Sequence, residues 1–243
     1  MNNCIIHPIP LFEFEMNKSD ETYRFNFGQL VTVVGYTWYI AGAREKILVD
    51  GGGSAEYLSK VRGIPTKEIQ TLDSGLSKLG ISFDDIDIII ATHLHHDHIA
   101  QAYRFPKARV LVQRAELEFA RKPHPLFAPM YVREFFDGLN FEVIDGDTKI
   151  CEEVSVLSTP GHSPGGQSVS VKTAQGIAVI AGLCTIRENF EPPSPIKEIM
   201  PVIAPGIHTD VLKGYDSVLR IREIADIVIP LHEPEFRQKD SIP

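Results

Sequence analysis

Cysteine and basic residues are scarce in this 243-residue sequence. The cysteines number three, Cys4, Cys151 and Cys184, and this odd, sparse count provides no disulfide framework and suits a reducing compartment. Lysine and arginine number 24 against 32 aspartates and glutamates, so the formal net charge is −8. This balance argues against a nucleic-acid-binding protein, which needs clustered basic side chains.

Long apolar runs are also absent. The longest ones, such as IDIIIA, fall far short of the roughly 20 residues that a membrane helix needs. The first residues, MNNCIIHPIPLFEFEM, lack the basic start, the sustained apolar run and the small-residue cleavage site of a signal peptide. We therefore expect a cytoplasmic protein without a membrane or nucleic-acid partner, as a monomer or a homodimer.

The hydrophobic patterns predict two β-rich halves, each closed by a helix and a strand. Residues 67–80 place Ile69, Leu72, Leu76 and Leu79 on one helix face before Gly80, and residues 210–225 predict a second, longer helix. β-branched and aromatic runs predict strands at 29–42, 45–50, 86–90, 108–113, 141–147, 154–162, 165–173, 176–182 and 225–232. We predict one domain over residues 1–243, of α+β class, with two sheets inside helical layers rather than a doubly wound parallel sheet.

The strongest functional signal is the segment THLHHDH, residues 92–98, directly after a buried strand. It holds His93, His95, Asp97 and His98, and imidazole and carboxylate are ligands that zinc and similar divalent metals prefer. Two histidines two positions apart can reach one ion, and the following Asp-His pair can reach a second. A solvated polar turn is the alternative, but the gathering of these four ligand-type residues within seven positions argues against it.

Two further histidines lie at the ends of predicted strands. His162 stands in STPGHSPGG and His232 in IVIPLHEPEF. Each signal is weak alone, because most turn histidines have no special role. Together with residues 92–98 they are what a site at the carboxyl ends of strands would require.

These motifs carry a resemblance to a known family. HLHHDH, TPGHSPGGQS, the C-terminal LHE and the upstream VDGGGS resemble the metallo-β-lactamase superfamily over residues 30 to 233. VQRAELE, IDGD and RENF are similar to segments of the N-acyl-homoserine lactonase-like hydrolases within it. The resemblance implies a four-layer αβ/βα sandwich with its site at one edge between two sheets.

The resemblance also implies two divalent metal ions, with zinc expected and iron or manganese as alternatives. It assigns His93, His95 and His162 to the first ion, and Asp97, His98 and His232 to the second. Asp50, at a strand end in VDGG, matches a family position that orients a ligand histidine. Its alternative role is to cap a glycine turn.

The segment GLCTIRENF, residues 182–190, departs from the lactonase pattern. The resemblance implies a metal-bridging aspartate here, but Gly182 and Leu183 occupy the two candidate positions. Cys184 offers a thiolate as a terminal zinc ligand in its place, or else it is a small buried hydrophobe. The tyrosine that positions substrate in such lactonases is replaced by Thr185.

The resemblance predicts a hydrolase that uses a metal-activated water, with Asp97 as both ligand and catalytic group, to open a small lactone, ester or amide. Thr185, Phe127 and Tyr131 are the predicted substrate contacts, and the aromatic segment 119–136 is a candidate apolar wall. Two alternatives remain open. One is a mononuclear iron oxygenase on the same fold, and the other is a non-catalytic relic that still binds metal.

Overall fold

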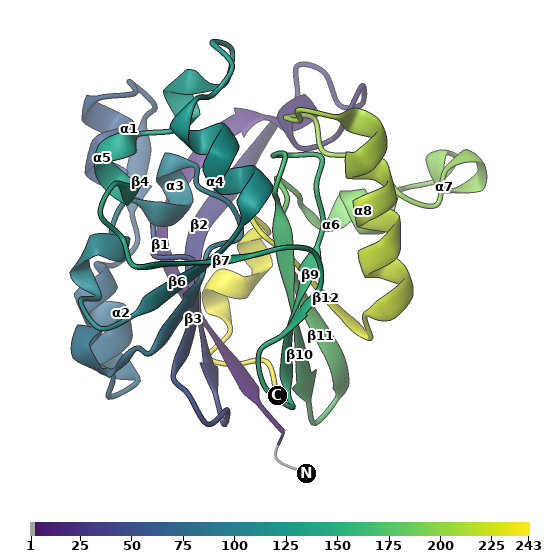
Figure 1. The fold of residues 1–243 in the computed structure, drawn as a ribbon. Helices are drawn as coiled ribbons and strands as arrows, with labels where there is room; N and C mark the ends of the chain where they lie inside the picture. The colour runs from purple at the N-terminus through teal and green to yellow at the C-terminus, as the bar shows by residue number, and fades with distance from the viewer. Residues whose placement is uncertain (1–2) are drawn as a thin grey trace.

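The computed structural model describes residues 3–243 as two β-sheets that pack face to face, with helices on the outer face of each (Figure 1). The seven-stranded sheet has, in spatial order, β4 (Thr66–Glu68), β1 (Ile5–Asn17), β2 (Leu30–Ala41), β3 (Ile47–Val49), β5 (Ile88–Ile90), β6 (Arg109–Gln113) and β7 (Phe141–Ile144). The five-stranded sheet has β12 (Ile227–Pro230), β11 (Gly176–Ala181), β10 (Gln167–Thr173), β9 (Val154–Ser158) and β8 (Thr148–Lys149). The predicted sandwich of two sheets inside helical layers is therefore confirmed.

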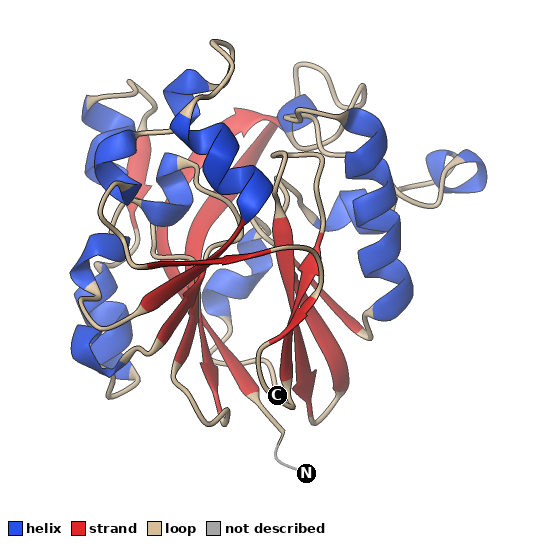
Figure 2. Cartoon of the chain, viewed as in Figure 1, coloured by secondary structure: helices blue, strands red, loops and turns tan. Residues whose placement is uncertain are grey.

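Figure 2 shows how the helices are divided between the two outer layers. The seven-stranded sheet is covered by α1 (Ala55–Lys60), α2 (Leu72–Lys78), α3 (His96–Ile99), α4 (Arg114–Arg121) and α5 (Arg133–Phe136). The five-stranded sheet is covered by α6 (Arg187–Phe190) and α8 (Val211–Ile224), while α7 (Ile196–Ile199) projects from the side. No helix within residues 3–243 has the length and apolar character to cross a membrane.

Three apolar clusters hold the layers together. One lies between the seven-stranded sheet and its helices, and joins Leu58 of α1 to Ile89 of β5. The central cluster joins the two sheets, with Trp38 of β2 and Val169 of β10 among its fully buried members. The third packs α8 against β11. Removal of this apolar surface from water is the main driving force for the arrangement.

The predicted helix at 210–225 is present as α8. It begins after Asp210, whose side chain accepts a hydrogen bond from the Lys213 backbone N–H at 3.2 Å, as an N-cap residue does. Val218 and Ile221, three positions apart, are fully buried against the five-stranded sheet. Helical spacing therefore identified this helix correctly.

The predicted helix at 67–80 begins later than expected. Residues Thr66–Glu68 form β4, and α2 starts only after Thr71, whose side chain accepts a hydrogen bond from the Ser74 N–H at 3.2 Å. Ile69 therefore lies outside the helix. Its spacing matched the helical pattern, but the strand pairing with β1 and the threonine cap set the boundary.

The first strand, β1, was not predicted, since Pro8 and Pro10 lie within it. Both prolines pair in register with β2, opposite Trp38 and Tyr36. The N–H of Ile6, which has the same orientation along the strand, bonds away from β2 to Ile242. A backbone N–H at Pro8 or Pro10 would therefore point to the outer side of β1 and not to β2. The missing N–H groups leave the pairing with β2 intact, and proline is tolerated at such an edge.

Parallel pairing brings the functional loops together. β3, β5 and β6 run parallel, and so do β11 and β12, so their carboxyl ends lie at one edge of each sheet. The segments that follow β3, β5, β9, β11 and β12 carry Asp50, THLHHDH, His162, Cys184 and His232 respectively.

Candidate metal centre

Two groups of ligand-type side chains meet at this edge. His93, His95 and His162 form a three-histidine group, and Asp97, His98 and His232 form what we call the Asp97 group. Within each group, ligand atoms from all three residues lie within 4.8 Å of one another. The structure therefore brings together residues from the ends of three different strands, β5, β9 and β12.

Hydrogen bonds turn the histidine rings toward a common space. His162 Nδ1 lies 2.7 Å from the Ile207 carbonyl oxygen, and His232 Nδ1 lies 3.2 Å from that of Val34. A carbonyl oxygen only accepts, so each Nδ1 donates and each neutral ring keeps its lone pair on Nε2. The Nε2 atoms of His162 and His93 approach to 3.2 Å. This orientation is the one that metal-binding histidines adopt.

Asp50 is fully buried and organises both groups. Its Oδ2 lies 2.9 Å from His98 Nδ1, and its Oδ1 accepts the Thr92 N–H at 2.7 Å. The Thr92 hydroxyl donates to Asp50 Oδ2 at 3.0 Å and lies 3.0 Å from His93 Nδ1. Asp50 adopts φ +62°, a left-handed conformation that costs a non-glycine residue energy. The carboxylate therefore contacts a histidine of the Asp97 group directly and reaches the three-histidine group through one hydroxyl.

Burial and neighbouring charges set the protonation of the site. Burial lowers the pKa of His93 and His95 well below the usual value and lowers the pKa of His162 and His232 to about 4. Burial also opposes the charge of His98, but the carboxylates of Asp97 and Asp50 raise its pKa to about 10. Neutral imidazole is the form that binds metal, so four of the five histidines are ready to act as ligands.

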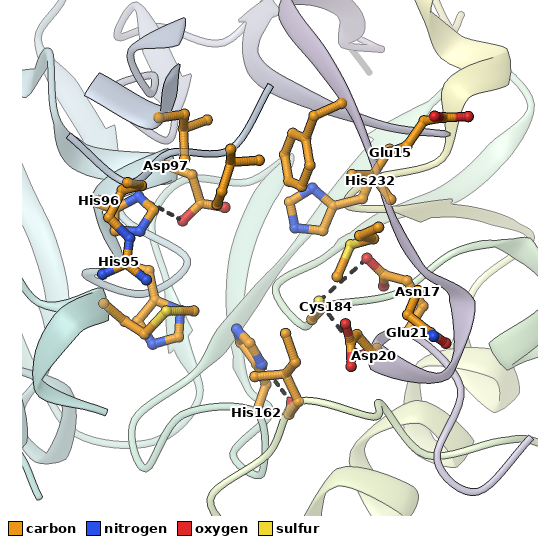
Figure 3. Close-up of a pocket in the computed structure, with 18 residues that line it drawn as sticks. Glu15, Asn17, Asp20, Glu21, His95, His96, Asp97, His162, Cys184 and His232 are labelled. Atoms are coloured by element: carbon orange, nitrogen blue, oxygen red, sulfur yellow. Dashed lines mark hydrogen bonds and ion pairs between the residues drawn. The ribbon is translucent and has the colours of Figure 1, made fainter. Parts of the chain in front are cut away.

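A buried pair that we call the Glu21–Cys184 pair lies next to the Asp97 group. The Cys184 thiol donates to Glu21 Oε1 at 3.3 Å, and these two side chains and His232 lie within 4.8 Å of one another (Figure 3). Burial raises the pKa of Glu21 to about 8 and that of Cys184 well above its usual value. All three cysteines are unpaired.

The backbone explains why no aspartate stands after β11. A Cβ atom on Gly182 would lie 1.7 Å from the Gln167 carbonyl oxygen, so this position has no room for a side chain. Leu183 is fully buried in the cluster beneath α8, away from the cavity. Cys184 is the first residue of the segment to face the cavity.

A cavity of about 340 Å³ opens beside both groups, and Figure 3 shows His95, Asp97, His162, Cys184 and His232 around it. Its apolar wall comes from five regions of the chain and comprises Phe14, Met16, Val33, Leu58, Ile64, Met130 and Ile207. Of the aromatic segment 119–136, only Met130 lines the cavity. The aromatic composition marked that segment as apolar without indicating which core it joins.

The three predicted substrate contacts lie outside the cavity lining. Thr185 is fully buried, and its hydroxyl donates to the Leu183 carbonyl at 3.1 Å. Phe127 packs on Phe119, with ring centroids 6.2 Å apart. Tyr131 stands behind His95, and its hydroxyl donates to Glu116 at 3.1 Å. The structure thus does not bring these three residues to the cavity. The hydroxyls of Thr185 and Tyr131 are hydrogen-bonded elsewhere, and the ring of Phe127 packs on another aromatic ring.

Three site residues were missed by sequence reasoning. Glu21 lies in a short polar segment with no motif. His96, inside THLHHDH, lines the cavity with both ring nitrogens buried and unpartnered. Glu116, in VQRAELE, accepts the Leu94 N–H at 3.0 Å and the Gly165 N–H at 3.2 Å, and so joins the two loops of the three-histidine group. The only signal for Glu116 was its place in a family-like segment.

Unpaired buried atoms test whether this donor set fits metal ions. Among the described residues, His95 Nε2, His98 Nε2, Asp97 Oδ1 and Glu21 Oε2 are buried without a hydrogen-bond partner. Such atoms are costly to leave unpaired, and a cation satisfies them. Histidine nitrogen, carboxylate oxygen and thiolate are the donors that zinc takes. The residues present therefore fit divalent cations in two adjacent groups.

The sequence model of the metallo-β-lactamase superfamily matches residues 30–223 of this chain. This range includes every residue of the three-histidine group and of the Asp97 group except His232. The chain belongs to the metallo-β-lactamase superfamily. This membership accounts for the sandwich and for a site at its edge, and it places the chain in a family of metallohydrolases.

Curated relatives within the superfamily include N-acyl homoserine lactonases. That of Bacillus thuringiensis is 36% identical over 152 residues, which cover 61% of this chain and 55% of the relative. AttM of Rhizobium radiobacter is 31% identical over 144 residues, 51% of this chain and 54% of the relative. The matched region thus spans about half the length of these relatives.

A solved structure is similar over nearly the whole chain. It is an N-acyl homoserine lactone hydrolase with the product N-hexanoyl-L-homoserine bound at its catalytic metal center. It has a TM-score of 0.79 and 25% sequence identity, and the match covers 98% of this chain and 96% of that one.

Proposed function

We propose that this protein is a metal-dependent hydrolase that opens a small lactone, ester or amide. The observation that carries the proposal is the pair of ligand groups beside an apolar cavity of about 340 Å³, a size usual for small-molecule sites. The three-histidine group would hold one divalent ion and the Asp97 group a second, with zinc as the expected metal. When bound, such ions generate a nucleophile from water near neutral pH and polarise a carbonyl group.

The side chains around the ions would bind, orient and move protons. Asp97 Oδ1 is buried and unpartnered at the cavity, so this carboxylate is placed to orient a water molecule and accept its proton. Asp50 holds His98 and, through Thr92, His93. The apolar wall would take the hydrocarbon part of the substrate and exclude bulk water from the reaction.

The relatives support a lactone as the first substrate to test, since several of them are N-acyl homoserine lactonases. Two differences argue for a wider panel. Gly182 provides no bridging carboxylate, and Thr185 lies away from the cavity. We therefore propose the general class, a carbonyl compound opened by water, rather than a particular homoserine lactone.

Metal-free protein, reconstituted with zinc, should be assayed against lactones, esters and thioesters with a pH indicator, because their cleavage releases a proton. Amides should be assayed by detection of the released amine, because amide cleavage releases no net proton near neutral pH. We expect hydrolysis of at least one class, lost on metal removal and restored by zinc. A flat response from fully metallated protein would contradict the proposal and favour a relic. Iron as the only bound metal, with oxygen uptake, would favour an oxygenase.

A further inference from the structure

The Asp97 group has an adjacent carboxylate from a distant part of the chain. Glu21 follows the short 3-10 helix Lys18–Asp20 after β1, more than 160 residues before Cys184, yet the two side chains are in hydrogen-bond contact. Glu21 is fully buried, and its Oε1 accepts the Cys184 thiol at 3.3 Å. Its Oε2 is buried and has no partner.

The backbone around Glu21 is firmly held. The side chain of Asn189, in the RENF segment, donates to the Glu21 carbonyl at 2.7 Å and to the Ile203 carbonyl at 3.1 Å. Gly206 packs so closely on this segment that a Cβ atom there would lie 1.9 Å from the Ser19 carbonyl oxygen. The placement of the Glu21 carboxylate is therefore fixed by the fold on two sides.

A buried carboxylate oxygen without a partner requires a physical explanation, because burying such a group costs free energy unless a donor or a cation compensates it. No basic side chain pairs with Glu21 among the described residues. Its neighbours are instead further ligand-type groups, Cys184 and His232, within 4.8 Å. A buried carboxylate oxygen without a partner, next to a thiol and an imidazole, is the environment expected of a metal ligand.

We propose that Glu21 and Cys184 are ligands of the second metal ion, so that the N-terminal segment supplies the carboxylate for which Gly182 has no room. Glu21 Oε2 and the Cys184 sulfur would complete the Asp97 group around the shared His232. The Cys184 S–H bond and the Glu21 carboxyl O–H bond would break as the sulfur and the oxygen bind the ion, and both protons would pass to solvent. The thiolate and the imidazole ligands of this site favour a divalent cation such as zinc or cobalt over magnesium or calcium.

The inference rests on the metal centre of the proposed function but not on its substrate. It adds the Glu21 carboxylate to the second site expected from Asp97, His98, His232 and Cys184, and it removes the need for a bridging side chain. It also explains why a carboxyl and a thiol are buried side by side. The carboxylate of Glu21 would be costly at this depth without a cation or a further donor.

The test is metal binding by the full-length protein and three variants: Glu21→Gln, Cys184→Ser and the matched control Asp20→Asn. Asp20 lines the same cavity next to Glu21 but belongs to neither ligand group. Zinc affinities come from competition with a chromophoric chelator. Cobalt-loaded protein reports thiolate ligation through its sulfur-to-metal charge-transfer absorption in the near ultraviolet.

We expect wild type and Asp20→Asn to bind two ions and to show the charge-transfer band. Glu21→Gln should weaken the second ion at least about tenfold while keeping the first, and Cys184→Ser should abolish the band. Two ions with wild-type affinity and an unchanged cobalt spectrum in Glu21→Gln would overturn the proposal, leaving Glu21 as a hydrogen-bond acceptor only.

Thermal unfolding of the metal-free variants checks that they fold. If Glu21→Gln does not fold, Glu21→Asp, which keeps the charge but shortens the reach, takes its place with the same expected loss of affinity for the second ion. Wild-type protein that binds two ions through Glu21 but hydrolyses nothing would contradict the proposed function alone, so the two failures are distinguishable.

Discussion

Replacement of Asp50 by asparagine tests how the buried carboxylate supports the metal centre. Asp50 accepts hydrogen bonds from the Thr92 N–H at 2.7 Å and the Thr92 hydroxyl at 3.0 Å, and it pairs with His98 Nδ1 at 2.9 Å. The side chain of asparagine is isosteric but has one acceptor oxygen. If that oxygen keeps the Thr92 N–H, the amide NH₂ faces two donors, the His98 ring and the Thr92 hydroxyl.

The magnitude follows from the lost support of the histidine ring. Removal of such a partner behind a metal ligand typically lowers metal affinity about 10- to 100-fold, or about 1.4–2.7 kcal/mol. We expect this loss for the ion of the Asp97 group. The three-histidine group should lose less, because Asp50 reaches His93 only through the Thr92 hydroxyl.

The assay is a competitive zinc titration of metal-free protein, fitted to two binding constants. Thr92→Val should show the opposite order, with the three-histidine group weakened more, since it removes the acceptor of His93 Nδ1. Asp87→Asn is the control, because Asp87 lies before β5, at the far end from the site, where its side chain accepts the Lys46 N–H at 2.9 Å. A folded Asp50→Asn protein with both constants unchanged would refute the orienting role of Asp50.

Three further predictions concern the surroundings of the site. Gly182→Asp should not create a bridging ligand but should cost about 3 kcal/mol or more in unfolding free energy, because its Cβ would lie 1.7 Å from the Gln167 carbonyl oxygen. Denaturant titration measures this, and a stable variant with a tighter second ion would contradict it. Glu116→Gln should cost about 1–3 kcal/mol and weaken the first ion, because an amide NH₂ would face a buried backbone N–H; unchanged stability and affinity would oppose this. The hydrogen bond from Arg220 lowers the pKa of Asp147 in the folded protein. The pair therefore stabilises the fold fully at pH values above about 3.9, the pKa of an aspartate in the unfolded chain. This stabilisation is lost as the pH falls from that value through the lower pKa of the folded state. Arg220→Met should therefore lose under about 1 kcal/mol at pH 7, with a smaller deficit at pH 3, and a deficit that grows on acidification would show that the sign is wrong.

The parts of the site that the sequence predicted are those with local signals. His93, His95, Asp97 and His98 fall in one seven-residue segment, and each remaining histidine follows a recognisable strand. The same holds for the fold, since β-branched runs and helical spacing identified most elements. Asp50 was indicated by its position at a strand end before glycines, but its contacts with Thr92 and His98 required coordinates.

The parts that were missed depend on contacts between distant segments. Glu21 stands in a polar segment that resembles an ordinary loop, and its burial arises only when RENF and residues 203–207 fold over it. Tyr131 was expected at the substrate, but Glu116 takes its hydroxyl. β1 was missed because proline normally breaks strands, and its tolerance here depends on which side of the strand lacks a neighbour.

The most direct test of the central claim is a stepwise zinc titration of metal-free protein, with hydrolysis of a responsive lactone or ester measured at each step. We expect two ions per chain, activity that develops as they bind, and loss of both in His95→Ala combined with His232→Ala. Full hydrolysis by protein that holds no metal, or a fully folded wild type that binds no divalent ion, would contradict it.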